Sequence, residues 1–270
     1  MKKLFYLFIT FTVLSSCSQY NKALKKPDIS EKFRVAEEMY DKGKFAKANK
    51  LFAQIVPSYR GKPQAEKLMF LYSKSYYEMK EYYLASYQFE RFVSSYPQSE
   101  KVEEAAFLSG KSVYMLSPVY SKDQTETRDA IEKLQTFINL FPESEFLPQA
   151  NELVKELDFK LERKAFEIAK QYNKIAGYTG DYTASIKACD NFILDFPGST
   201  YREEAYFLKL DSAYKMAMNS VEVKREGRLE KVELHYNNYK KSYSQSERME
   251  DADKMLEDAN IELEKYRIKS

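Results

Sequence analysis

The sequence predicts an all-α fold, a superhelix of about five helical hairpins with a capping helix at its C-terminal end. Two observations predict it. A nine-residue phrase recurs as FVSSYPQSE from Phe92, FINLFPESE from Phe137, FILDFPGST from Phe192 and, more loosely, YKKSYSQSE from Tyr239. In addition, seven glycines and eight prolines are few for 270 residues, which favours long helices over a turn-rich β fold.

Residues 1–16 have the pattern of a lipoprotein signal peptide. Two lysines precede an apolar run from Leu4 to Leu14, which is too short to span a bilayer as a helix of about 20 residues. The run ends in LSSC, so Cys17 resembles the lipobox cysteine that receives diacylglycerol. An ordinary secretory signal with a chance cysteine is the alternative. We expect residues 17–29 to be the lipidated N-terminus and an extended tether of at most about 40 Å.

Each copy of the recurring phrase ends one helix and begins the next. Its first residue and the aromatic four positions later share a helical face. In three copies a proline follows directly, and proline cannot continue a helix. The polar residues after it start the next helix, where Thr200 and Glu203 have the spacing of a capping box. Together with a small residue that lets two helices approach, this is the tetratricopeptide pattern.

The repeats are expected in chain order at residues 30–61, 64–98, 101–143, 150–198 and 201–245. Residues 30–143 would form an N-terminal group of three repeats and residues 144–245 a C-terminal group of two. A helix within residues 246–270 would cover the exposed end of the array. The third repeat holds an insertion between Tyr114 and Ala130, and the fourth starts with a long helix from about Pro148 to Ala176.

The first helices carry an aromatic, a charged and an aromatic residue at positions i, i+4 and i+7. These triplets are Phe33-Glu37-Tyr40, Phe70-Lys74-Tyr77, Phe107-Lys111-Tyr114 and Phe207-Asp211-Tyr214. An unpaired charge in a dry interior costs several kcal/mol, so we expect the triplets to face a groove that binds an extended peptide. Lys74 and Lys111 could meet a carboxylate there. The alternative is that these aromatics are core residues, as aromatics at helical spacing usually are.

Composition argues against several other functions. Lys plus Arg (43) nearly balance Asp plus Glu (41), and without a nucleic-acid-binding motif this gives no support for a nucleic-acid partner. One histidine, His235, and one thiol besides Cys17, Cys189, give no metal-ligand spacing. No phosphate-binding loop or nucleophile elbow is present. We therefore expect no cofactor and no enzymatic activity, and we expect Cys189 to be a buried helical thiol.

Three stretches resemble the BamD family of outer-membrane assembly lipoproteins. They are AEEMYDKGKFAKANKLF, then EEAAFLSGKSVYMLSP with the following DQTETRDAIEKLQTFINLFPESEF, and YNKIAGYTGDYTASIKACDNFILDFPGSTYREEAYFLKLDSAYKMAMNS. They sample nearly the whole mature chain. The middle stretch, with its Ser-Pro loop and DQT, is the most specific.

The resemblance implies a subunit of the β-barrel assembly machinery, lipid-anchored at the periplasmic face of the outer membrane. Its N-terminal repeats would bind unfolded β-barrel proteins, and its C-terminal repeats would dock on the POTRA domains of BamA. Carried onto this chain, the substrate groove would consist of Phe33, Tyr40, Phe70, Lys74, Tyr77, Phe107, Lys111 and Tyr114. No specific docking residue is matched. The centre of the second helix of repeat four reads SIKACDN, with Lys187 but no arginine, so the sequence does not support an arginine-centred contact there.

Two other kinds of lipoprotein use the same repeats. One is a different periplasmic scaffold that serves peptidoglycan or secretion machinery. The other is a glycan-binding lipoprotein of the nutrient-uptake type, which is usually longer and rich in tryptophan, whereas this chain has no tryptophan.

Overall fold

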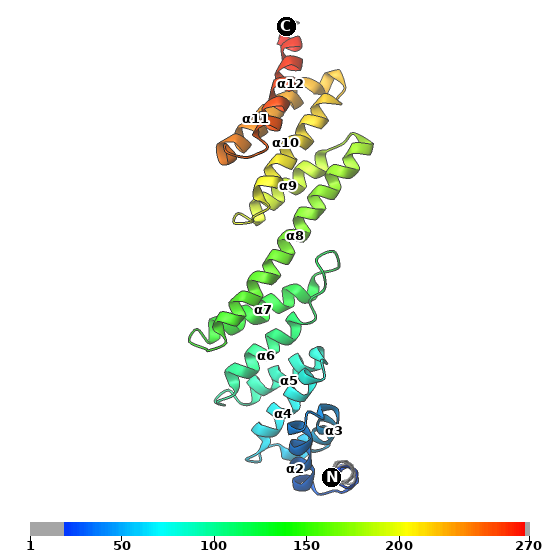
Figure 1. Cartoon of the computed structure of the whole chain (residues 1–270), viewed down its shortest axis with the longest axis vertical. Helices are drawn as coiled ribbons and strands as arrows, with labels where there is room; N and C mark the ends of the chain where they lie inside the picture. Colours follow the sequence, from blue (N-terminus) through cyan, green and yellow to red (C-terminus); the bar gives the residue numbers. More distant parts are fainter. Residues whose placement is uncertain (1–18, 268–270) are drawn as a thin grey trace, which may run out of the picture. The chain divides into compact units, whose positions relative to one another are not determined.

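A computed structural model describes residues 19–267, which form paired antiparallel helices and contain no strand (Figure 1). The all-α fold of helical hairpins is thus confirmed. The pairs are α2 (Ile29–Asp41) with α3 (Phe45–Ile55), α4 (Ala65–Glu78) with α5 (Tyr82–Ser95), α6 (Val102–Tyr114) with α7 (Thr125–Leu140), α8 (Leu147–Thr179) with α9 (Thr183–Asp195), and α10 (Arg202–Met218) with α11 (Glu222–Tyr243). A short 3₁₀ helix, η1 (Val56–Tyr59), follows α3, and α12 (Met249–Arg267) follows the last pair. Within the described range, no helix is both long and apolar enough to cross a bilayer.

The chain divides into two compact units, and the division lies inside α8. Unit 1 runs up to Pro118 and continues over Lys122–Leu157, whereas unit 2 holds Val119–Ser121 and the residues from Asp158 onward. The predicted division between residues 143 and 144 differs because the first part of α8 packs into unit 1. Ala150 and Leu157 are fully buried there in one hydrophobic cluster with residues of α6 and α7.

The recurring phrase forms the same structure in all four copies. Its two aromatic residues contact each other at the end of the second helix of each hairpin. The ring centroids are 5.3 Å apart for Phe92 and Tyr96, 5.6 Å for Phe137 and Phe141, 5.2 Å for Phe192 and Phe196, and 5.8 Å for Tyr239 and Tyr243. The phrase therefore marks a helix end in which an aromatic pair closes the hairpin.

A serine in each phrase stabilises the turn that leads into the next helix. The hydroxyl oxygen accepts a hydrogen bond from the backbone N–H two residues later, for Ser99 (3.0 Å), Ser144 (3.4 Å), Ser199 (3.1 Å) and Ser246 (3.0 Å). The capping box predicted for Thr200 and Glu203 is wrong. The N-cap of α10 is Tyr201, without a side-chain bond, and Glu203 instead accepts a hydrogen bond from Ser246.

Each hairpin is held by a ring of the first helix that lies against a ring of the second helix. The centroid distances are 6.3 Å for Phe33 and Phe52, 5.4 Å for Phe70 and Phe92, 5.6 Å for Phe107 and Phe137, 5.6 Å for Phe166 and Phe192, and 5.7 Å for Phe207 and Tyr239. Such pairs contribute about 0.5–1.5 kcal/mol each beyond their buried area. One contact of one kind therefore recurs in all five hairpins of the described chain.

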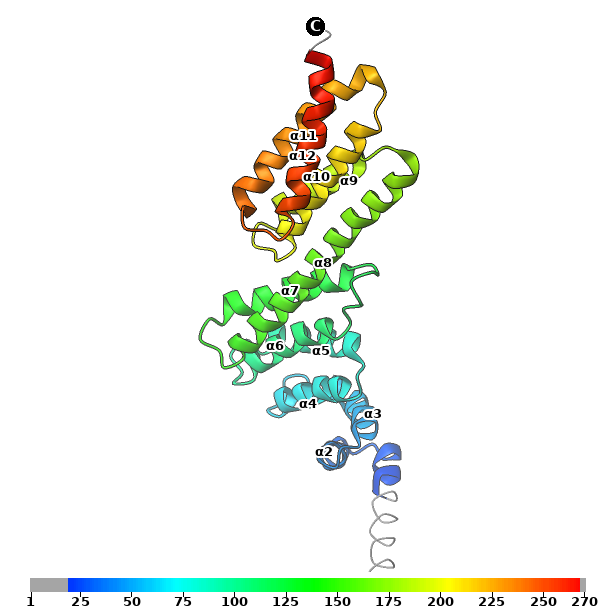
Figure 2. The same cartoon turned by 45° about the horizontal axis from the view of Figure 1, so that its top comes forward.

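The segment expected to be an extended tether is largely helical instead. Residues 19–25 form a helix, and Tyr20 and Ala23 are buried in the same hydrophobic cluster as Leu51 and Phe52 of α3. Figure 2 shows this short helix next to α3. The apolar side chains at positions 20, 23 and 24 share one helical face, which explains why the segment packs. Cys17 itself lies outside the described residues.

The insertion in the third repeat is an ordered loop between α6 and α7. Gln124 is almost fully buried, and its amide nitrogen donates to the carbonyl oxygens of Lys122 and Asp123. The Thr127 hydroxyl donates to the Gln124 side-chain oxygen at 2.8 Å and lies 2.7 Å from the Ser117 hydroxyl. Side-chain hydrogen bonds thus fix both ends of the loop.

A substitution of Gly110 tests the close approach of α6 and α7 in repeat three. A Cβ added there would lie 2.9 Å from Leu134 Cδ2 and 3.3 Å from the Leu134 backbone nitrogen. Gly110→Val should lower the free energy of unfolding by about 1–3 kcal/mol, because it overpacks the hairpin. Chemical denaturation measures this change.

Gly227, in α11, is the matched control, since nothing lies within 4 Å of a Cβ added there. Gly227→Val should change stability by less than about 0.5 kcal/mol. Equal losses for both variants would show that helix propensity, and not the approach of α6 and α7, decides the effect.

Candidate peptide-binding site

The phenylalanines of the predicted groove belong to the interior of the repeats. Phe33 is 4% exposed, Phe70 7% and Phe107 2%. All three rings contact the second helix of their own hairpin, as described above. The prediction that they line a peptide groove is therefore wrong, and the alternative interpretation of them as core residues is correct.

The error arose because a first helix in the stack packs on two sides. In α4, Phe70 lies in one hydrophobic cluster with Phe89 and Phe92 of α5, whereas Leu68 and Tyr72 lie in another cluster with residues of α2 and α3. Met69 and Ser73 are buried as well. Two sides of α4 are therefore buried instead of one. Phe70 lies on the second buried side, which the sequence pattern had assigned to the groove.

The charged residues at the centres of the first two triplets lie at the edge of this interior, and each forms an ion pair. Glu37 pairs with Lys67 at 2.5 Å, and Lys74 pairs with Glu104 at 3.1 Å. Both ion pairs join the first helix of one repeat to the first helix of the next. The Lys74 ammonium also lies 5.6 Å from the centroid of the Phe70 ring.

Lys111 differs from Lys74 in having no carboxylate partner. Its ammonium lies 5.5 Å from the centroid of the Phe107 ring, and no Asp or Glu of residues 19–267 forms an ion pair with it. By contrast, Glu104 is already engaged by Lys74 and Lys101. Burial alone would raise the pKa of Glu104, but the hydrogen bonds from these two lysines lower it below its ordinary value.

The tyrosines of the triplets are half-buried at the turn of each hairpin. Tyr40 meets Phe45 edge-on at 5.2 Å, and Tyr77 meets Tyr82 edge-on at 5.5 Å. The Tyr114 hydroxyl donates to Glu156 of α8 at 2.7 Å. Burial, together with nearby carboxylates, raises the pKa of Tyr40 to about 12 and that of Tyr114 to about 12. These hydroxyls therefore remain protonated hydrogen-bond donors.

The accessible part of the predicted groove is consequently made of tyrosines and charges. We call this set the first-helix ladder, and it consists of Glu37, Tyr40, Lys74, Tyr77, Lys111 and Tyr114. After burial, the largest contributions to the raised pKa of Tyr40 come from two carboxylates outside this set, Glu78 of α4 and Glu104 of α6.

The fourth repeat carries a version of the triplet that the sequence pattern missed. Phe166 is 1% exposed, and Lys170 lies 5.4 Å from the centroid of its ring. At the third position Asn173 replaces tyrosine, and its amide donates to Asp211 at 3.0 Å and Ser212 at 2.8 Å in α10. A search for phenylalanine followed four residues later by lysine, without the tyrosine, would have found it.

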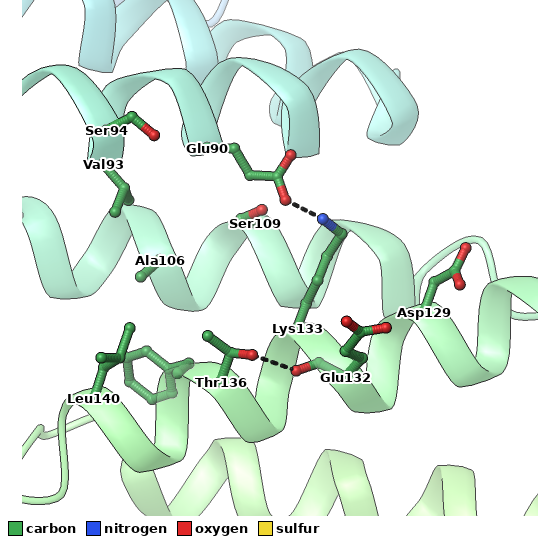
Figure 3. A pocket seen from close by; sticks show the side chains of 11 residues that line it. Glu90, Val93, Ser94, Ala106, Ser109, Asp129, Glu132, Lys133, Thr136 and Leu140 are labelled. Atoms are coloured by element: carbon green, nitrogen blue, oxygen red, sulfur yellow. Dashed lines mark hydrogen bonds and ion pairs between the residues drawn. The ribbon is translucent and has the colours of Figure 1, made fainter.

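Unit 1 also has a cavity of about 630 Å³ between α5, α6 and α7 (Figure 3). An ion pair between Glu90 of α5 and Lys133 of α7 crosses one part of it. Val93, Phe137 and Leu140 supply apolar lining, and Leu140 is 63% exposed. Sequence reasoning did not name this cavity. The available signal was Leu140, an apolar residue at a solvent-facing helical position.

Unit 2 has a cavity of about 440 Å³ in the corresponding place, between α9, α10 and α11. Its lining is rich in cations and includes Lys187, Arg228 and Lys231, with Asp190 as the only carboxylate among the lining residues. That carboxylate is paired with Lys209 at 2.5 Å. We call this the basic cavity.

The two residues considered for chemistry both lie in unit 2. Cys189 is fully buried in α9, and burial raises the pKa of its thiol to about 12, which confirms the expected buried thiol. His235 lies in the wall of the basic cavity. In the part of the chain that the structure describes, no group of His, Cys, Asp and Glu side chains could hold a metal ion.

Comparison with known families decides where the chain belongs. The family model YfiO, described as outer membrane lipoprotein, matches residues 25–180, which is more than half of the chain. The chain belongs to the YfiO family of outer membrane lipoproteins. The matched range contains the first three hairpins, α8 and every residue of the first-helix ladder.

Other comparisons add little about this YfiO family member. No curated protein matches the chain. Among solved structures, the TPR2AB domain of yeast Sti1, solved in a complex with pHSP90, is similar with a TM-score of 0.38 and 13% identity. That match covers 86% of this chain and 98% of the Sti1 chain.

His235 makes the stability of unit 2 depend on pH. Burial, with smaller contributions from the charges of Lys209 and Lys231, lowers its pKa from 6.5 to about 4, while Asp190 opposes the shift. The unfolded chain therefore binds a proton between these two values and the folded chain does not. The associated stability is fully present above pH 6.5 and is lost as the pH falls towards 4.

His235→Gln should remove this part of the pH dependence, on the order of 1–3 kcal/mol between the two pKa values. Thermal unfolding of both proteins at several pH values measures it. As the pH falls from neutral towards 4, the parent should lose stability relative to the variant, so the difference between their melting temperatures should shift in favour of the variant. A constant separation would contradict the assigned pKa.

Proposed function

We propose that this YfiO family member is a non-catalytic subunit of the outer-membrane β-barrel assembly machinery, of the BamD type. It binds unfolded barrel proteins through its N-terminal repeats and docks on the POTRA domains of BamA through its C-terminal repeats. The observation that carries the proposal is the match of the outer membrane lipoprotein model to the residues that hold the first-helix ladder. The resemblance of the three sequence stretches to BamD supplies the identity of the partners.

The anchor is a diacylglycerol thioether on Cys17, which holds the protein at the periplasmic face of the outer membrane. The LSSC sequence after a short apolar run supports this assignment. Several acyl chains bind a membrane stably, whereas one chain is marginal.

The first-helix ladder suits the C-terminal segment of an unfolded barrel protein, which is aromatic and ends in a carboxylate. Tyr40, Tyr77 and Tyr114 offer half-exposed aromatic rings on three successive repeats, although the Tyr114 hydroxyl already donates to Glu156. Aromatic edges of this kind bind large side chains with little loss of conformational entropy, since tyrosine has only two side-chain torsions.

Lys111 is the better candidate for the carboxylate than Lys74. Lys74 already pairs with Glu104, so a ligand would have to displace that ion pair. Lys111 lies over an aromatic ring and has no ion-pair partner within residues 19–267. A charge-assisted hydrogen bond to such a lysine contributes about 1.5–3 kcal/mol.

The basic cavity is the candidate docking surface for BamA in unit 2. Lys187 and Lys231 are exposed at its rim, and Leu234 beside them is 56% exposed. A cationic rim around an apolar residue complements an acidic surface with an apolar anchor. The cavity of unit 1 in the corresponding place has acidic residues, including Glu132 and Asp129, and does not share this character.

The double variant Tyr77→Ala/Lys111→Ala tests client binding. Its affinity for a peptide with the C-terminal sequence of a barrel protein should fall about tenfold or more, because an aromatic contact and a charge-assisted bond are lost together. Fluorescence anisotropy of a labelled peptide measures the affinity.

The matched control is Tyr214→Ala/Lys215→Ala, which changes the same residue types at half-buried positions of repeat five. It should leave peptide binding unchanged. Equal losses in both variants, or no loss in either, would remove the ladder from the binding site. Phe70 is unsuitable for this test because its ring is part of the core.

The double variant Lys187→Glu/Lys231→Glu tests docking. Recovery of BamA in a detergent pulldown from outer membranes should drop about tenfold or more, since two charges of the basic cavity are reversed. Lys241→Glu/Lys254→Glu, at exposed positions outside the cavity, is the control with the same change in charge. Recovery of secretion or peptidoglycan proteins in place of BamA would favour the periplasmic scaffold instead.

A further inference from the structure

The first repeat carries a charge that the rest of the chain lacks. Residues 19–62 hold 11 Lys and Arg against 5 Asp and Glu, a net charge of +6, whereas residues 63–270 hold 30 against 36, a net charge of −6. The near-neutral total therefore conceals a strongly basic N-terminal end. Segments of one sign next to an anchor are typical of contact with a surface of the opposite sign.

Five lysines of this region belong to two helices that pack together, and we call this set the N-terminal basic face. They are Lys22 and Lys25 of the helix of residues 19–25, Lys44 at the N-cap of α3, and Lys47 and Lys50 of α3. Four of them are exposed and Lys47 is half-buried. The other lysines nearby have partners, for example Lys26 with Glu31 at 2.9 Å and Lys42 with Glu38 at 2.6 Å. No carboxylate of residues 19–267 forms an ion pair with any of the five.

Packing brings the two halves of this face together. The Lys47 ammonium of α3 lies 5.2 Å from the centroid of the Tyr20 ring. The Lys32 ammonium bonds to the Leu24 carbonyl at 3.5 Å and to Gln54 of α3 at 2.5 Å. The helix of residues 19–25 is thus fixed against α3, so its exposed lysines and those of α3 belong to one rigid body.

The N-terminal basic face lies only a few residues along the chain from Cys17, and this limits its distance from a lipid attached there. Only Ser18 separates Cys17 from the helix of residues 19–25. At about 3.6 Å per residue, the Cα of Cys17 lies within roughly 11 Å of the Cα of Tyr20. This is close to the Debye length of about 8 Å at physiological ionic strength. A lipid on Cys17 would therefore hold the basic face within electrostatic range of the head groups.

We propose that the N-terminal basic face binds anionic phospholipid head groups, so that the first repeat lies on the membrane surface in addition to being anchored there. The proposal rests on the lipid anchor at Cys17 proposed above. Each lysine close to an anionic surface contributes about fivefold in binding, equivalent to about 1 kcal/mol. Several such lysines together hold the first repeat in a defined orientation, which an anchor on a flexible tether would not do.

The test uses the mature chain with Cys17→Ser, so that binding by the lipid does not mask binding by the face. The measurement is co-sedimentation with vesicles of phosphatidylglycerol mixed with phosphatidylcholine, compared with vesicles of phosphatidylcholine alone. The protein should prefer the anionic vesicles, and the preference should disappear at high salt. Equal binding to both kinds of vesicle would overturn the proposal.

Lys22→Gln/Lys25→Gln/Lys50→Gln should reduce binding to the anionic vesicles about tenfold or more, at about fivefold per lysine in contact. The control Lys155→Gln/Lys241→Gln/Lys254→Gln removes the same charge at exposed positions elsewhere. It should bind like the parent. All six lysines are exposed and make no ion pair among the described residues, so both variants should keep the parent melting temperature. Equal losses in the two variants would reduce the effect to net charge and overturn the assignment of this face.

Failure of the anchor is a separate result. The intact mass of the Cys17 protein purified from membranes shows whether the diacylglycerol thioether is present. Its absence would overturn the proposed anchor. The protein in the vesicle experiment has no attached lipid. That experiment therefore tests whether the basic face binds anionic lipid, whether or not the mass measurement finds the anchor.

Discussion

The contact on which each repeat depends is a phenylalanine of the first helix lying against an aromatic ring of the second. It occurs in all five hairpins of the described chain, from Phe33 with Phe52 to Phe207 with Tyr239. In the last four hairpins the second-helix ring belongs to the recurring phrase, where it also contacts the aromatic that ends the helix. One cluster of aromatic rings therefore both closes the hairpin and ends its second helix. This explains why the nine-residue phrase is nearly the same in each repeat while the other positions vary.

This use of phenylalanine determines which residues remain for recognition. Because the ring at the first triplet position is buried, only the other two members of the triplet, the charged residue and the tyrosine, reach the surface. Lys74 and Lys111 both lie above a buried ring, yet Lys74 is paired with Glu104 and Lys111 is not. Neighbouring repeats with the same geometry thus differ in the charge that they can offer to a ligand.

The two cavities illustrate the same separation of fold and chemistry. Each lies between the second helices of consecutive repeats and above the first helix between them. In unit 1 the lining includes Glu90, Asp129 and Glu132, and Lys133 is paired with Glu90. In unit 2 it includes Lys187, Arg228 and Lys231. The two hollows thus have the same place in the repeat, and their side chains give one an acidic and the other a basic character.

The sequence by itself determined the repeat fold, the long first helix of repeat four, the insertion in repeat three and the buried state of Cys189. These features depend on neighbours within about one hairpin, so local spacing of aromatics and prolines is enough to predict them. Only the tertiary structure decided that Phe33, Phe70 and Phe107 are interior and that residues 19–25 pack as a helix. Both depend on how many sides of a helix meet other helices. A first helix in a stack is covered by its partner helix and by the preceding repeat. The apolar periodicity of one helix does not reveal how many neighbouring helices cover it.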